Sequence, residues 1–291
     1  QAEDGIRDRS PSRGLGDVYK RQLLTLAGIL TIGDVDGTAA SNSGKGINVT
    51  SSATLGDYDL SAESYLAIAE DKTLAGQLNL QSNGELNISG SGAYTGDIEL
   101  AGGKFSAVDD QVLSGTLSVT ADSELAVASG YTFELSQDGG LPLGANTLTL
   151  SGGGSLESEG LTLNNANSKL LLNSITVDSI STSADNSGLD VDNNSTVTSL
   201  TVAHTTPVSI ATGKTLSGAV TVTAGSLQLD ETGTLASTVS MSGGTLDADE
   251  TLTLSGALSH TDDITTVSYT PLRAHETASY LVGRLLLEKK K

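Results

Sequence analysis

The chain has 291 residues, with 15 lysines and arginines against 35 aspartates and glutamates, and a formal net charge of −20. It contains no cysteine, no tryptophan and only two phenylalanines. This composition excludes a disulfide scaffold and a thiolate metal site, the charge excludes a nucleic-acid-binding protein, and any large core must be built from aliphatic side chains.

The two ends of the chain differ in composition from the rest. Residues 1–22 and 266–291 hold every arginine of the chain. The strings QAEDGIRD and GDVYKRQ at the front, and LRAHET and LVGRLLLEKKK at the back, resemble in-frame translations of sequencing-adapter DNA. We therefore expect both ends to be artefacts, disordered or at the C-terminus a short helix, and residues 23–265 to be a piece of a larger protein.

The first half of residues 23–265 contains short segments in which apolar and polar residues alternate, as in Leu78-Asn-Leu80 and Leu117-Ser-Val119. This two-residue period is typical of a half-buried β-strand. Equivalent apolar residues recur every 19 or 20 positions. The predicted rows are Leu78–Ile98–Leu117, Leu80–Leu100–Val119 and Leu86–Phe105–Leu125.

The second half repeats with a step of 19 residues. Thr215-Leu-Ser-Gly-Ala-Val220 returns as Thr234-Leu-Ala-Ser-Thr-Val239 and again as Thr253-Leu-Ser-Gly-Ala-Leu258. The predicted rows here are Val197–Leu216–Leu235–Leu254, Leu170–Leu189–Val208–Leu227–Leu246, and Leu172–Val191–Ile210–Leu229–Ala248.

Units of this length cannot close a core alone and must stack on their neighbours. Glycines mark the breaks between strands, at Gly76, Gly96, Gly115, Gly218, Gly225 and Gly244. The sequence therefore predicts an all-β, single-tube parallel β-helix, or β-solenoid, with a repeat of about 19–20 residues and stacked rows of Leu, Val and Ile inside.

One stretch of this repeat resembles a known family. The segment Ile88-Ser-Gly-Ser-Gly-Ala-Tyr-Thr-Gly-Asp-Ile-Glu-Leu-Ala-Gly-Gly-Lys-Phe105 is similar to the strand repeat of bacterial autotransporter passengers, a pattern shared with haemagglutinin-type proteins. The resemblance implies a right-handed β-helix on the outer surface of a bacterium or secreted from it, often as an adhesin or a stalk.

Acidic residues suggest one candidate metal site. Asp190 and Asp192 are followed by Asp230, Asp247 and Asp249, and Asp249 lies one 19-residue step after Asp230. Stacked carboxylates repel one another, and a calcium ion bound by Asp230, Asp247 and Asp249 would relieve that repulsion. The simpler interpretation, which we prefer, is that these are solvated surface charges, and no other cofactor is predicted.

Two histidines lack partners at metal-ligand spacing. They are His204, in a turn before Pro207, and His260, in the row of Val222 and Met241.

Outward Ser/Thr pairs recur in register and could bind ordered water, although Thr is also a favoured residue in strands. The pairs are Ser118 with Thr120, Thr221 with Thr223, Ser240 with Ser242, and Ser259 with Thr261.

The sequence thus favours a non-enzymatic extracellular or cell-surface adhesin shaft or structural spacer. Its expected partners are a host-cell, matrix or polysaccharide surface, with no nucleic acid and no membrane insertion by this segment. A polysaccharide-binding or polysaccharide-cleaving β-helix is the first alternative, disfavoured because residues 23–265 have no arginine and only five lysines. An ice-binding Ser/Thr array is the second.

Overall fold

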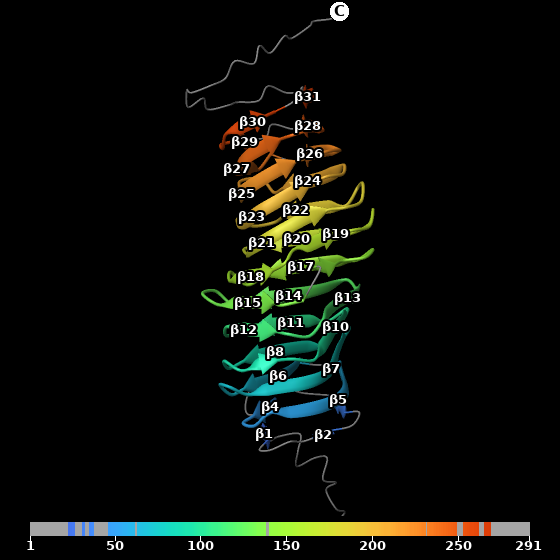
Figure 1. Ribbon diagram of the computed structural model, residues 1–291, viewed down its shortest axis with the longest axis vertical. Helices are drawn as coiled ribbons and strands as arrows, with labels where there is room; N and C mark the ends of the chain where they lie inside the picture. Colours follow the sequence, from blue (N-terminus) through green and yellow to red (C-terminus); the bar gives the residue numbers. More distant parts are fainter. Residues whose placement is uncertain are drawn as a thin grey trace, which may run out of the picture.

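The computed structural model describes residues 46–61, 63–137, 140–230, 232–248 and 253–261, together with the backbone of strands at 23–26, 31–32, 35–37 and 265–268. The predicted adapter-like ends, apart from Thr266–Ser268, lie outside the described residues. The described part is all β, with strands laid across one long axis (Figure 1). It contains no helix that is long and apolar enough to cross a membrane.

One parallel sheet of 13 strands runs the length of the molecule and receives one strand from each turn of the chain. We call it the first face. Its strands, in spatial and chain order, are β1 (Leu23–Leu26), β4 (Gly46–Val49), β6 (Glu63–Ile68), β8 (Glu85–Ser89), β11 (Lys104–Ala107), β14 (Ser123–Val127), β17 (Thr147–Ser151), β20 (Lys169–Asn173), β22 (Gly188–Val191), β24 (Thr206–Ile210), β26 (Ser226–Asp230), β28 (Thr245–Ala248) and β31 (Thr265–Ser268).

The other 18 strands form a second parallel sheet that bends into two faces. Its long strands run along both faces: β5 (Ala53–Leu60), β7 (Thr73–Gln81), β21 (Thr176–Thr182), β23 (Ser195–Val202), β25 (Thr215–Val222) and β27 (Thr234–Met241). On the second face lie β2 (Thr31–Ile32), β9 (Ala93–Tyr94), β12 (Gln111–Leu113), β15 (Thr132–Leu135), β18 (Ser155–Ser158) and β29 (Thr253–Leu254). On the third face lie β3 (Val35–Gly37), β10 (Asp97–Ala101), β13 (Leu117–Ala121), β16 (Leu141–Pro142), β19 (Leu161–Leu163) and β30 (Leu258–His260).

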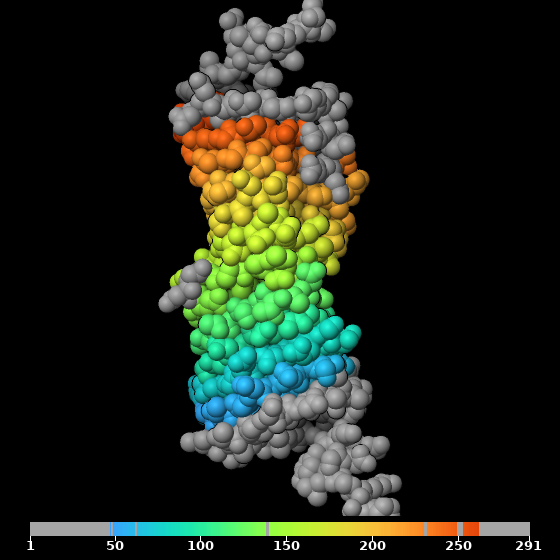
Figure 2. All heavy atoms as spheres, turned by 90° about the vertical axis from the view of Figure 1, so that its right-hand side faces the viewer, coloured from blue at the N-terminus to red at the C-terminus, as the bar shows by residue number. Residues whose placement is uncertain are grey.

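Each turn therefore lays down three extended segments, and the turns stack into a β-solenoid. Figure 2 shows the described turns as one continuous column from the blue end to the red end. The predicted fold class is confirmed.

The interior of the column is filled by one side chain in two from every strand, because successive residues of a strand point to opposite sides. These inward residues are overwhelmingly Leu, Val and Ile, and most are almost completely buried. Three large aromatic side chains, Tyr94, Phe105 and Phe133, are buried with them, and the rings of Phe105 and Phe133 pack 4.8 Å apart across the core. Burying one such apolar side chain contributes about 1.5–3 kcal/mol.

Glycines form the corner between the second and third faces, where consecutive turns approach most closely. Gly76 and Gly218 have φ of 128° and 126°, a region that other residues rarely adopt. A Cβ atom on Gly218 would lie only 1.7 Å from the carbonyl oxygen of Val197 in the preceding turn. At Gly76 and Gly218, both the backbone angle and the available space therefore require glycine.

The predicted rows agree with the register of the sheets in most places. All three rows of the first half are confirmed, with Ile98 between Leu78 and Leu117, Leu100 between Leu80 and Val119, and Phe105 between Leu86 and Leu125. In the second half, Leu216–Leu235–Leu254 and Leu170–Leu189–Val208 are also confirmed.

Three steps of the predicted second-half rows are wrong. Val197 pairs with Gly218, and Ser195 pairs with Leu216. Val208 pairs with Leu229, so Leu227 pairs with Thr206, and Leu229 does not follow Ile210. The pairs Val197–Gly218 and Val208–Leu229 are each 21 residues apart, two more than the 19-residue step. The nearby bulge lies in β23, where Thr198 is left without a partner between Val197 and Ser199. A shift of two residues keeps every side chain on its predicted side, because the period of a strand is also two.

The repeat of 19–20 residues holds for many turns, and the largest departure lies in the middle of the column, where Leu125 pairs with Leu150. The backbone N–H of Thr147 bonds to Asp122, 25 residues earlier, whereas the equivalent bond from Thr116 to Asp97 spans 19 residues. The additional residues enter around β15 and β16, between the first-face strands β14 and β17. A fixed period from the sequence cannot place an insertion that the other turns lack.

The inward assignment of Leu227 leads to a direct test. Leu227 is 1% exposed, between Thr206 and Leu246. We expect Leu227→Asp to lower the free energy of unfolding by several kcal/mol, since an unpaired charge is costly to bury. Urea unfolding followed by circular dichroism measures the loss. The outward neighbour variant Ser226→Asp should unfold almost as the wild type does, and equal stability of the two variants would contradict the assignment.

Candidate functional site

The first face carries a column of outward charged side chains at one register position. Glu63, Glu85, Lys104 and Glu124 follow one another on consecutive strands, and Thr149 comes next. We call these the charged column. Adjacent members are separated by the spacing of neighbouring strands, about 4.8 Å.

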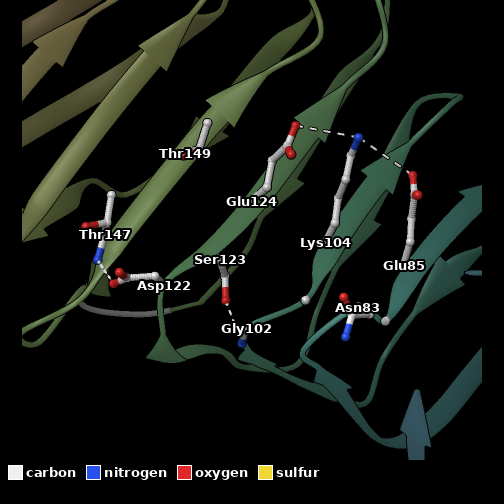
Figure 3. Close-up of a pocket in the computed structure, with 11 residues that line it drawn as sticks. Asn83, Glu85, Gly102, Lys104, Asp122, Ser123, Glu124, Thr147 and Thr149 are labelled. Atoms are coloured by element: carbon white, nitrogen blue, oxygen red, sulfur yellow. Dashed lines mark hydrogen bonds and ion pairs between the residues drawn. The ribbon is translucent and has the colours of Figure 1, made fainter. Parts of the chain in front are cut away.

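A shallow groove of about 450 Å³ lies beside this column, across strands β8, β11, β14 and β17. Figure 3 shows Glu85, Lys104, Glu124 and Thr149 along one side, with Asn83, Asp122 and Thr147 closer to the edge of the sheet. Three glycines, Gly84, Gly102 and Gly103, also line it. The close packing of the turns leaves no room for a side chain at Gly84, because a Cβ there would lie 2.0 Å from the carbonyl oxygen of Leu60.

Lys104 stands between the two carboxylates of the groove. Its Nζ lies 3.7 Å from Glu85 Oε1 and 3.6 Å from Glu124 Oε1, and the three side chains are 35%, 32% and 36% exposed. Both distances are too long for hydrogen bonds, although they allow an ionic attraction. The ammonium group is thus held by charge between two acceptors and keeps its three N–H donors available to a ligand.

Each carboxylate is oriented through one of its oxygens. The Ser106 hydroxyl donates to Glu85 Oε1 at 3.3 Å, and the Ser151 hydroxyl donates to Glu124 Oε1 at 2.6 Å. Within the described part of the chain, the second oxygen of each carboxylate accepts no hydrogen bond. The groove therefore presents an ordered row of acceptor, donor and acceptor.

The edge of the groove is fixed by bonds between the turns. Asp122 Oδ1 accepts from the backbone N–H of Thr147 at 2.7 Å, and Ser123 Oγ accepts from the N–H of Gly102 at 3.0 Å. Asn83 occupies a left-handed turn position with φ of 69°, closed by a bond from Gly84 N–H to Gln81. These bonds hold the polar rim rigid before any ligand arrives.

The like charges of Glu63 and Glu85 stack at the end of the charged column. The Tyr65 hydroxyl donates to Glu63 Oε1 at 2.5 Å. That hydrogen bond, with burial and the charges of Glu63 and Glu85, raises the pKa of Tyr65 to about 12. The phenol therefore stays protonated and offers its proton to Glu63, while Lys104 offsets the charge of Glu85.

This groove was missed by the sequence analysis, although the sequence contains a signal for it. Glu85, Lys104 and Glu124 are separated by 19 and 20 residues, the same step that relates the buried rows. Applying that step to charged residues of both signs would have placed the lysine between two glutamates. The hollow itself depends on which glycines lie at the surface, which needs the three-dimensional register.

Of the three predicted calcium ligands, the structure describes only Asp247 in full. Asp247, on β28, pairs in register with Gln228 and not with a second acid, and its Oδ1 is buried without a hydrogen-bond partner among the described residues. Asp230 ends β26 beside Ser209, but its side chain and the whole of Asp249 lie outside the described residues. No cluster of three metal-ligating side chains occurs in the described part of the chain. The calcium site stays a prediction.

The remaining acids of the predicted ladder and the two histidines have other neighbours. Asp190, on β22, forms an ion pair with Lys169 of the preceding turn. His204 lies in the bend before β24, with Nδ1 3.5 Å from Asp185 Oδ1. His260 continues the row of Val222 and Met241 as predicted, and its side chain is exposed.

Many other acidic side chains bond one turn to the next. A carboxylate accepts from a backbone N–H of an adjacent turn at Asp97, Asp109, Asp110, Asp122 and Asp185. Such a carboxylate provides an acceptor for a backbone N–H group that would otherwise be left unpaired where the chain turns between strands. Part of the negative charge of the chain therefore has a structural role.

Comparisons with family models, with curated proteins and with solved structures found no match. The structure itself shows a parallel β-solenoid with a polar groove on the first face of its described part.

The bonds at Asp97 predict how stability depends on pH. Hydrogen bonds from the backbone N–H of Thr116, at 2.8 Å, and from its hydroxyl, at 2.7 Å, hold the pKa of Asp97 below its ordinary value. A lowered folded-state pKa stabilises the fold fully above the unfolded pKa of about 3.9, and the contribution is lost as the pH falls through the folded pKa.

We therefore expect the stability difference between wild type and Asp97→Ala to be constant above about pH 5 and to shrink at lower pH. Urea unfolding at several pH values measures it. Thr116→Val, which removes only the hydroxyl donor, should show the same pH trend with a smaller amplitude. A difference that is equal at neutral and strongly acid pH would contradict the prediction.

Proposed function

We propose that the chain is the shaft of an extracellular or cell-surface bacterial protein and acts as a structural spacer or as the stem of an adhesin, without enzymatic activity. The observation that supports this proposal is the in-register stacking of the inward rows. Each turn buries its apolar residues against the turns before and after it, so that length can grow turn by turn at constant width.

The location outside the cell is supported by the resemblance of residues 88–105 to autotransporter passengers. A surface dominated by acids, Ser and Thr also fits a stem, because it resists edge-to-edge aggregation of a long strand stack. On this proposal the partners are host-cell, matrix or polysaccharide surfaces.

Solution scattering tests the rod directly. We expect the full chain to give the scattering profile of an elongated particle, with a maximum dimension well above that of a compact protein of 291 residues. A compact, near-spherical particle would contradict the shaft. Incubation with neutral and acidic polysaccharides separates the alternatives, because an adhesin retains them intact whereas an enzyme shortens them.

The third face supports a second candidate function, the binding of ordered water or ice. An outward column of hydroxyl side chains runs over six consecutive turns, at Thr162, Ser181, Thr201, Thr221, Ser240 and Ser259. The predicted positions Thr221, Ser240 and Ser259 are in register and are joined by Thr162, Ser181 and Thr201, whereas the predicted Ser118 pairs with Glu99. Its regular step of about 4.8 Å gives an evenly spaced row of hydroxyls.

Replacing Thr201 in the middle of this column tests the candidate. We expect wild-type protein to shape ice crystals in a slowly cooled droplet. Thr201→Tyr should lose that effect, because the large ring interrupts the row of hydroxyls. Thr245→Tyr, on the outer side of the first face, is the matched control. Ordinary disc-shaped ice crystals in the presence of the wild-type protein would contradict this candidate function.

A further inference from the structure

We infer that the groove bounded by Glu85, Lys104 and Glu124 is a binding site for a neutral saccharide. The inference deepens the proposed function, because it identifies the adhesive contact of the shaft. It rests on that function only in placing the saccharide outside the cell.

The groove combines features that the described outer surface does not repeat. Lys104 is flanked on both sides of its column by carboxylates, whereas Lys169 has one such neighbour. The groove is also hollowed by Gly84, Gly102 and Gly103, so a ligand can lie beside the charged column and reach its polar atoms from the side.

The charges in the groove exclude most ionic ligands. A polyanion that approached Lys104 would meet Glu85 and Glu124 within about one strand spacing on either side, and the whole chain carries a net charge of −20. A cation drawn to either carboxylate would meet the Lys104 ammonium. A neutral ligand avoids both repulsions.

The pattern of hydrogen-bonding groups selects a polyol among neutral ligands. Lys104 can only donate, and the open oxygens of Glu85 and Glu124 can only accept. A hydroxyl group does both, so each of two neighbouring hydroxyls can accept from Nζ and donate to one carboxylate. Bonds to charged groups are about twice as strong as bonds between neutral partners.

The size of the polar rim suits a short stretch of saccharide chain. Glu85 and Glu124 lie two strand spacings apart, about 10 Å, and Thr149 extends the row by one more turn. Along the opposite rim the Asn83 amide and the Thr147 hydroxyl make no side-chain hydrogen bonds to other described residues and are open to further hydroxyls. Two polar rows facing a glycine floor can contact both edges of a sugar ring.

The structure also indicates that binding at one groove is weak. The large aromatic side chains Tyr94, Phe105 and Phe133 are buried in the core, and the groove has no aromatic ring on which a sugar could stack. Adhesion through such a site depends on many copies engaging one polymer.

The experiment uses the full chain immobilised on beads, so that many grooves meet each polymer. The probes are a neutral glucan, a neutral mannan and a neutral galactan, with alginate as a polyanion and polylysine as a polycation. We expect retention of at least one neutral polysaccharide in physiological salt. Retention of no neutral polysaccharide, or of polylysine alone, would overturn the inference.

Three variants locate the binding. Glu124→Gln keeps the size of the side chain and Lys104→Gln shortens it by one atom, and each should weaken retention about tenfold, since each removes a charge-assisted bond. Lys214→Gln removes the same charge far from the groove and should bind as wild type does. If Lys104→Gln and Lys214→Gln retained the polysaccharide equally, the location of the binding site in this groove would be contradicted. Unchanged circular dichroism melting shows that the variants are folded, and the scattering profile tests the shaft independently of this result.

Discussion

The structure depends on the stacking of apolar side chains from one turn directly on those of the next. No turn has a core of its own, because its inward residues touch partners that belong to other turns. The chain contains no cysteine, and the ion pairs of the described residues lie at the surface with partly exposed partners. Surface ion pairs contribute at most about 1 kcal/mol each, so the burial of Leu, Val and Ile must supply most of the stability.

The same stacking creates an electrostatic problem on the outside. A row that repeats an acid would place carboxylates about 4.8 Å apart over many turns. The third face avoids this by alternation, with the Asn79 amide between Asp59 and Glu99 and donating to Asp59 at 2.8 Å. The first face avoids it with Lys104. Donors thus separate some outward acids, and several others bond to the backbone of an adjacent turn, whereas Glu63 and Glu85 or Glu134 and Glu157 still lie on adjacent strands.

The fold was predictable because two periods in the sequence report the same geometry. Alternation every second residue gives the side of the strand, and the 19-residue step gives the partner in the next turn, which is why Leu216, Leu235 and Leu254 were aligned correctly. The errors fall where a turn changes length, as between Val197 and Gly218. The groove could be predicted only in part, since the step relates Glu85, Lys104 and Glu124, but the hollow depends on where Gly84, Gly102 and Gly103 come together.

Stacking constrains the inward residues far more than the outward ones, and the outward ones can therefore diverge along the column. The third face shows the result. Its first turns carry Asp59 and Glu99 among amides, and its last turns carry Thr221, Ser240 and Ser259 with no acid in that column. Because neighbouring turns can differ in what they expose while their inward rows stay in register, a surface groove can arise within four turns without disturbing the core. The groove occupies such a stretch, from β8 to β17, and the buried rows beneath it continue unchanged from Leu86 through Phe105 and Leu125 to Leu150.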